Sequence, residues 1–136
     1  MISVLIVDDN EADRYLLKRQ LKETGLDLAI VERDSGAAAL SFLSDYRAQS
    51  GADPTRFPPA VIVLDVNMPL VDGWTFLEEF AQLRNVHDFS GSVVMMYSSS
   101  ERPEERKRAE AYEFVRGYLV KGAFDSDELR ATIETR

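Results

Sequence analysis

Five short apolar runs, rich in β-branched residues, alternate along the chain with longer segments of helical periodicity. The runs cover residues 2–7, 28–31, 61–64, 93–97 and 118–120. They are apolar throughout rather than alternating between apolar and polar residues, which is typical of strands buried on both faces. Regular alternation of such strands with helices predicts an α/β fold in which helices cover both faces of a doubly wound, five-stranded parallel sheet.

Capping residues mark the helices between the runs. Asn10 is placed to cap a helix that continues to about Thr24, and Gly25 is placed to end it. Ser35 is placed to cap the second helix, and Asp72 the third. Pro103 lies in the first turn of the fourth helix. The last helix has Asp125 or Ser126 as its cap.

The apolar faces of the first two helices can be predicted from their spacing. The residues expected on the core side are Ala12, Tyr15, Leu16, Leu17 and Leu21 in the first helix, and Ala39, Leu40, Phe42 and Leu43 in the second. The Gly/Pro-rich segment 47–60 follows, and we expect an irregular connection there.

Polar residues stand where four of the five strands end. They are Asp8 and Asp9 after the first strand, Asp65 after the third, Ser98 after the fourth and Lys121 after the fifth. The carboxyl ends of parallel strands meet at one edge of the sheet, and ligands of doubly wound folds bind at that edge. We therefore expect three carboxylates, a hydroxyl and an ammonium group at one rim.

This set of groups suits phosphoryl chemistry. Clustered carboxylates bind Mg²⁺, which keeps coordination positions for water and phosphate oxygens. A carboxylate can also attack phosphorus and form an aspartyl-phosphate, whose charge Ser98 and Lys121 are suited to neutralise. Each residue alone has a structural explanation, such as a helix cap or a turn. All of them together on one rim indicate a chemical site.

Composition excludes several other classes of protein. The chain has 136 residues, the size of one domain, and 45% of them are hydrophobic, which argues against disorder. The formal net charge is −8, and the basic cluster at 102–108 is interleaved with Glu104 and Glu105, so we expect no nucleic-acid partner. Cysteine, a signal peptide and a membrane-spanning segment are absent from the sequence, which predicts a soluble cytoplasmic protein.

Four motifs carry a resemblance to a known family. In order along the chain they are "LIVDD", "VIVLDVNMPLVDG", "VVMMYSS" and "GYLVK". Together they resemble the response-regulator receiver domain of two-component signalling. The resemblance extends over nearly the whole chain and implies a single receiver domain at 1–136, with the CheY-like, flavodoxin-like strand order 2-1-3-4-5.

The resemblance also implies a role for each site residue. Asp65 would be the phosphoacceptor, Asp9 a direct ligand of Mg²⁺ and Asp8 a ligand acting mainly through water. The backbone carbonyl of Asn67 would be a further metal ligand, and Lys121 would bind the phosphate. Ser98 and Tyr118 would form the switch pair. Asn67 and Ser100 would control the lifetime of the phosphoryl group.

The partners follow from the same resemblance. A sensor histidine kinase or a phosphotransfer protein would donate the phosphoryl group. A downstream protein of unknown identity, or a second copy of the chain in a homodimer, would dock on the face formed by the last two helices and the fifth strand. The chain would not be an enzyme beyond catalysing its own phosphoryl transfer and dephosphorylation.

One residue departs from the family pattern. Proline usually follows the lysine there, in a cis bond that aims the lysine at the phosphate, whereas this chain has Gly122. A non-proline cis bond costs about 2.5–4 kcal/mol, so we predict a trans Lys121–Gly122 bond.

Two alternatives remain open at this point. The first is a receiver-like interaction module that is never phosphorylated; the intact set of site residues argues against it, and Gly122 favours it. The second is a phosphatase of the haloacid-dehalogenase type, which also uses a strand-end aspartate, magnesium, a hydroxyl and a lysine. That family needs a second acid two residues after its nucleophile, where this chain has Asn67.

Overall fold

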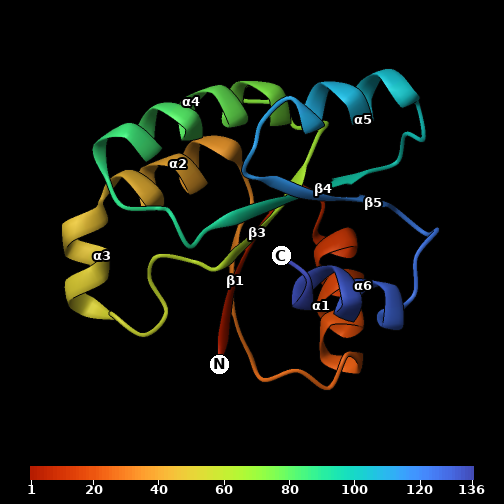
Figure 1. Ribbon diagram of the computed structural model, residues 1–136, viewed down its shortest axis with the longest axis horizontal. Coiled ribbons are helices and arrows are strands. Elements are labelled where there is room, and N and C mark those ends of the chain that lie inside the picture. The colour runs from red at the N-terminus through yellow and green to blue at the C-terminus, as the bar shows by residue number, and fades with distance from the viewer.

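The computed structural model describes all 136 residues, and Figure 1 shows a central sheet with helices on both sides. The strands are β1 (Ile2–Val7), β2 (Leu28–Arg33), β3 (Val61–Asp65), β4 (Val93–Ser98) and β5 (Val115–Val120). The helices are α1 (Glu11–Glu23), α2 (Gly36–Ser44), α3 (Tyr46–Ala52), α4 (Gly73–Val86), α5 (Pro103–Glu110) and α6 (Ser126–Glu134).

All strand pairs are parallel, and the sheet has the order β2-β1-β3-β4-β5. Both the predicted fold class and the predicted strand order are therefore confirmed. The register explains how the polar residues meet at one rim: Val7 of β1 lies opposite Leu64 of β3, and Ser98 of β4 lies opposite Val120 of β5. Asp8, Asp65 and Lys121, at the ends of β1, β3 and β5, consequently lie at the same edge of the sheet.

Two hydrophobic clusters, one on each face, hold the helices to the sheet. On one face Leu17 and Leu21 of α1 and Leu129 and Ile133 of α6 pack against the sheet. On the other face the buried residues of α2, α4 and α5 pack against the opposite side chains of the same strands; they include Ala39, Leu43, Phe76, Leu77, Phe80 and Ala109. None of the helices is both long and apolar enough to cross a bilayer.

The predicted caps form as expected at four helices. The side chains of Asn10, Ser35, Asp72 and Asp125 each accept a hydrogen bond from a backbone N–H in the first turn of the following helix. The last cap is Asp125 and not Ser126. Each cap satisfies a donor that the start of a helix would leave unpaired.

The apolar stripe of α1 is narrower than predicted. Leu17 and Leu21 are fully buried, whereas Ala12 is exposed and Tyr15 and Leu16 are 57% and 52% exposed. Two leucines spaced by one helical turn are enough to fill the layer that α1 shares with α6. The expectation that Ala12, Tyr15 and Leu16 belong to the core was wrong.

The connection after α2 is also more ordered than predicted, because helix α3 (Tyr46–Ala52) begins one residue before the segment 47–60 and takes up its first part. The ring of Tyr46 packs edge-on against Phe57 and Phe89, at centroid distances of 5.3 and 5.2 Å. Burial of an aromatic ring in this way stabilises a short helix that its Gly-containing sequence would not favour alone.

Candidate functional site

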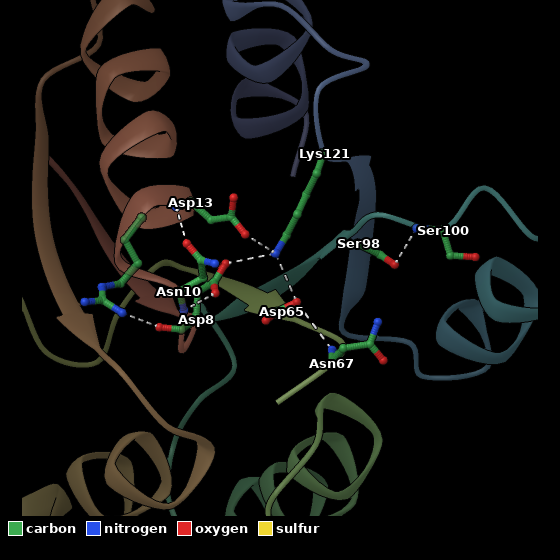
Figure 2. A network of polar contacts seen from close by, with 9 residues as sticks. Asp8, Asn10, Asp13, Asp65, Asn67, Ser98, Ser100 and Lys121 are labelled. Carbon is green, nitrogen blue, oxygen red and sulfur yellow. Dashed lines mark hydrogen bonds and ion pairs between the residues drawn. The ribbon is translucent and has the colours of Figure 1, made fainter. Parts of the chain in front are cut away.

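The polar residues predicted at the strand ends lie together at one rim of the sheet (Figure 2). Asp8 directly follows β1, and Asp65 and Ser98 are the last residues of β3 and β4. Lys121 follows β5, and its side chain extends toward Asp8 and Asp65. The rim therefore brings together groups that are up to 113 positions apart in the sequence.

The backbone turns sharply after Asp65. The N–H of Gly73 donates to the carbonyl of Val66 at 2.9 Å, which folds the loop "VNMPLVD" back onto the end of β3. A Cβ atom at position 73 would lie 2.8 Å from the Cα of Val66 and 2.9 Å from the carbonyl oxygen of Asp65. Only glycine fits such a close approach of two backbone segments, so Gly73 shapes the pocket around Asp65.

Three carboxylates form one cluster at the rim. Asp8 and Asp65 are buried and Asp9 is exposed, and one oxygen of each lies within 4.8 Å of the others. Oxygens at this spacing could hold one hard divalent cation, for which carboxylates are the preferred ligands. One oxygen of Asp8 accepts from the N–H of Asn10 at 2.9 Å, and the N–H of Asn67 donates to Asp65 at 3.3 Å.

Lys121 is the positive charge of the site. Its Nζ donates to Oδ2 of Asp8 and Oδ1 of Asp65, each at 3.2 Å, and to Oδ2 of Asp13 at 2.9 Å. The ammonium group also lies 4.8 Å from the centroid of the Tyr97 ring. Sequence reasoning did not identify Asp13 as a site residue. Its place as an acidic residue in the first turn of α1, the helix that starts from this rim, is the signal that could have marked it as a candidate.

The electrostatics of the site follow from burial and like charge. Burial, and then repulsion from Asp8, raise the pKa of Asp65 from 3.8 to about 7, although Lys121 opposes both effects. Burial alone would lower the pKa of Lys121, but hydrogen bonding to Asp13 and attraction to Asp65 and Asp8 raise it overall. Without a cation, the rim therefore holds a carboxylate whose ionised form is disfavoured, beside a lysine whose charged form is favoured.

A chain of hydrogen bonds leads from Ser98 to Tyr118. The buried Oγ of Ser98 accepts from the N–H of Ser100 at 3.1 Å, and the carbonyl of Ser100 accepts from the hydroxyl of Tyr118 at 3.3 Å. The same hydroxyl lies 3.2 Å from a carboxylate oxygen of Glu105 in α5. Burial raises the pKa of Tyr118, which keeps this hydroxyl protonated as a donor. Ser100 thus joins the two predicted switch residues.

The turn after Lys121 explains why glycine follows it. The N–H of Ala123 donates to the carbonyl of Val120 at 3.0 Å, and Gly122, third in this four-residue turn, has φ +77°. A turn with positive φ at its third position favours glycine, and proline, locked near −65°, cannot adopt it. The chain has one cis peptide bond, Phe57–Pro58, so the predicted trans Lys121–Gly122 bond is confirmed.

Comparison with known proteins identifies the class to which this fold and rim belong. The family model of the response regulator receiver domain matches residues 4–134. The chain therefore belongs to the response regulator receiver domain family, as the sequence motifs indicated. This assignment does not support the haloacid-dehalogenase alternative.

Individual proteins of this family share much of the chain. It is 34% identical over 102 residues to response regulator Rcp1 of Synechocystis, covering 75% of this chain and 65% of that protein. It is 28% identical to the probable methanogenesis regulatory protein FilR2 of Methanothrix harundinacea, covering 96% and 78% of the two chains. A two-component response regulator from Cytophaga hutchinsonii superposes with a TM-score of 0.80 at 27% identity, covering 99% and 96%.

The raised pKa of Asp65 predicts how stability depends on pH in the metal-free protein. Between about pH 5 and 7 the folded state binds a proton at Asp65 that the unfolded chain has released, so the free energy of unfolding should fall as the pH rises. The full effect is on the order of 2–4 kcal/mol. Urea denaturation in the presence of a chelator should show this slope in the parent and a much flatter one in Asp65→Asn.

The exposed Asp27→Asn variant is the control for removal of a carboxylate elsewhere, and it should keep the parent slope. Equal slopes in the parent and in Asp65→Asn would show that Asp65 titrates normally.

Proposed function

We propose that this chain is a phosphorylation-dependent signalling receiver in which Asp65 accepts a phosphoryl group from the phosphohistidine of a sensor histidine kinase or a phosphotransfer protein. The observation that carries the proposal is the setting of Asp65. The side chain of Asp65 is 6% exposed, and its carboxylate accepts a hydrogen bond from Lys121 at 3.2 Å and belongs to the oxygen cluster with Asp8 and Asp9. A nucleophile, a cation site and a fixed ammonium group thus converge on one point.

The transfer is a displacement at phosphorus. A carboxylate oxygen of Asp65 attacks the phosphorus atom, the P–N bond of the phosphohistidine breaks, and the imidazole nitrogen keeps the electron pair and takes a proton from solvent. Attack by water on the aspartyl-phosphate later releases inorganic phosphate and restores Asp65. Both steps gather negative charge on the phosphoryl oxygens, so both depend on the positive groups at the rim.

Asp8, Asp9, Asp65 and the backbone carbonyl of Asn67 would hold Mg²⁺. When bound, the ion would neutralise phosphoryl oxygens and relieve the repulsion among the carboxylates. Both oxygens of Asp8 already accept hydrogen bonds, from Asn10 and from Lys121, whereas Asp9 is exposed and takes part in no hydrogen bond or ion pair of the structure. This difference supports Asp9 as the direct ligand and Asp8 as a ligand acting through water.

The remaining residues act around the phosphoryl group. Lys121 and the hydroxyl of Ser98 donate to its oxygens. Asn67 and Ser100 lie two residues beyond Asp65 and Ser98, the last residues of β3 and β4, and their side chains would control the approach of the attacking water. They therefore set the lifetime of the phosphoryl group.

Ser98 begins the route by which phosphorylation reaches a partner. Movement of its hydroxyl toward the phosphoryl group pulls on Ser100, whose carbonyl holds the Tyr118 hydroxyl. Tyr118 then turns inward, and the face formed by α5, β5 and α6 changes shape. A downstream protein, or a second copy of the chain, binds that face in the cytoplasm. The net charge of −8 makes nucleic acid an unsuitable ligand.

The acceptor assignment predicts the outcome of labelling. With Mg²⁺ and a small phosphoryl donor such as acetyl phosphate, the parent should gain one phosphoryl group that is stable in acid and lost in hydroxylamine, as an acyl phosphate is. Asp65→Asn should gain none, because an amide oxygen is a poor nucleophile. Intact-mass spectrometry measures both, and Asp27→Asn should label like the parent.

Labelling of Asp65→Asn to the parent level would refute the acceptor role. Failure of the parent itself to label would favour the interaction module that is never phosphorylated.

The ligand assignment predicts an order of metal affinities. Asp9→Asn should weaken Mg²⁺ binding by about tenfold or more, since a direct ligand is lost, and Asp8→Asn should weaken it less. Isothermal titration calorimetry of the unphosphorylated proteins gives the dissociation constants. Equal affinity in Asp9→Asn and the parent would exclude Asp9 from the metal site.

The switch route predicts a localised change in dynamics. Addition of a phosphoryl mimic such as beryllofluoride should alter amide hydrogen exchange across residues 101–124, because the hydrogen bonds of Tyr118 rearrange. Tyr118→Phe, which lacks the hydroxyl that reaches Ser100, should show a smaller change in α5. Identical exchange with and without the mimic in the parent would contradict the route.

A further inference from the structure

The ammonium group of Lys121 has three N–H donors, and three carboxylates accept them. Asp8 and Asp65 belong to the cluster that is suited to a divalent cation, whereas Asp13 does not. Asp13 also makes the shortest of the three contacts, at 2.9 Å against 3.2 Å for each of the others. Figure 2 shows it approaching Nζ from helix α1, on the side away from the end of β5.

The backbone N–H of Lys121 donates to the carbonyl of Ser98 at 2.8 Å, which fixes the start of the side chain but leaves its four-carbon stem free to choose among rotamers. A Cβ atom added at Gly122 would meet no other heavy atom within 4 Å, so the turn directly after the lysine is open on that side. The ammonium group lies 4.8 Å from the centroid of the Tyr97 ring, and this cation–π contact does not fix the orientation of its N–H donors. The position of Nζ therefore depends on its hydrogen-bond partners.

Asp13 is well placed to fix the position of the Lys121 ammonium group. Its own N–H donates to the Oδ1 of the capping residue Asn10 at 3.0 Å, which fixes the first turn of α1. Leu17 and Leu21, further along the same helix, are fully buried and hold α1 to the sheet. The carboxylate of Asp13 is thus mounted on a rigid element, and it remains 31% exposed.

We propose that Asp13 is a positioning residue for Lys121. Once a cation engages Asp8 and Asp65, Asp13 is the one carboxylate of the three that stays with the ammonium group, and it holds that group beside the phosphoryl position. The inference rests on the proposed function, because positioning matters to transfer only if Asp65 is the acceptor. It adds a residue of α1 to the machinery of phosphoryl transfer.

A simpler role for Asp13 makes the opposite prediction. As a negative charge near a site that must take an anionic donor, Asp13 would only repel that donor. Its removal would then speed phosphorylation, and the gain would shrink as salt is added. If Asp13 positions Lys121, its removal slows phosphorylation because the lysine samples unproductive orientations.

The test is a double-mutant cycle on the initial rate of phosphorylation by acetyl phosphate at saturating Mg²⁺. The proteins are the parent, Asp13→Asn, Lys121→Met and the double variant. We expect Asp13→Asn to be slower by about three- to tenfold in the parent background and to have no further effect once Lys121 is gone. Asp13→Glu should recover part of the rate.

Glu11→Gln is the matched control, since it removes an exposed carboxylate from the same first turn of α1 and leaves Lys121 untouched. It should label at the parent rate. Asp13→Asn labelling as fast as the parent or faster, or slowing equally with and without Lys121, would overturn the proposal.

A second measurement does not depend on phosphorylation. In the Mg²⁺-loaded protein, ¹⁵N relaxation of the Lys121 ammonium group should show greater mobility in Asp13→Asn than in the parent, and no increase in Glu11→Gln. Unchanged mobility in Asp13→Asn would overturn the positioning role. A parent that never labels would defeat the proposed function, while the relaxation data would still decide whether Asp13 holds Lys121.

Discussion

The architecture of the site depends on one ammonium group held among three carboxylates. Lys121 joins the ends of β1, β3 and β5 and the first turn of α1 through Asp8, Asp65 and Asp13. Two of these carboxylates are buried, and burying like charges side by side is costly unless a positive charge offsets it. Lys121 supplies one such charge, and the cluster of Asp8, Asp9 and Asp65 could hold a divalent cation that supplies more.

Much of this site could be predicted from the sequence, because the rim is a property of the sheet. Continuous apolar runs mark buried parallel strands, and the polar residue that ends each run must lie at the same edge as the others. Asp8, Asp65, Ser98 and Lys121 therefore meet whatever the details of loops and helices. Gly122 was informative in the same way, since the cost of a non-proline cis bond predicted the trans bond that the structure has.

The features that the sequence did not reveal depend on tertiary packing. The first turn of α1 marks Asp13 as a candidate, but its contact with Lys121 depends on how α1 packs against the sheet, which the local pattern of a helix does not encode. Helix α3 is stabilised by the packing of Tyr46 against Phe57 and Phe89, which are close to it only in the folded chain. Strand β5 begins at Val115, although Gly117 interrupts its apolar run. A Cβ atom there would lie 2.8 Å from Thr132 of α6, so the glycine allows that helix to approach.

The contacts of the rim lead to both helical layers. Ser98 leads through Ser100 to Tyr118 and Glu105, and so to α5 on one face of the sheet. Lys121 leads through Asp13 to α1, which packs with α6 on the other face.

A phosphoryl group on Asp65, as proposed, would add negative charge between these two routes, and the hydroxyl of Ser98 and the ammonium group of Lys121 would respond to the same charge. Because Asp13 holds Lys121 at 2.9 Å, the proposed contact of the ammonium group with phosphoryl oxygens would be made while it stays bonded to the start of α1. Under the proposed function, the state of Asp65 would therefore reach the start of α1, beside which Tyr15 and Leu16 are exposed, as well as the face that carries Tyr118.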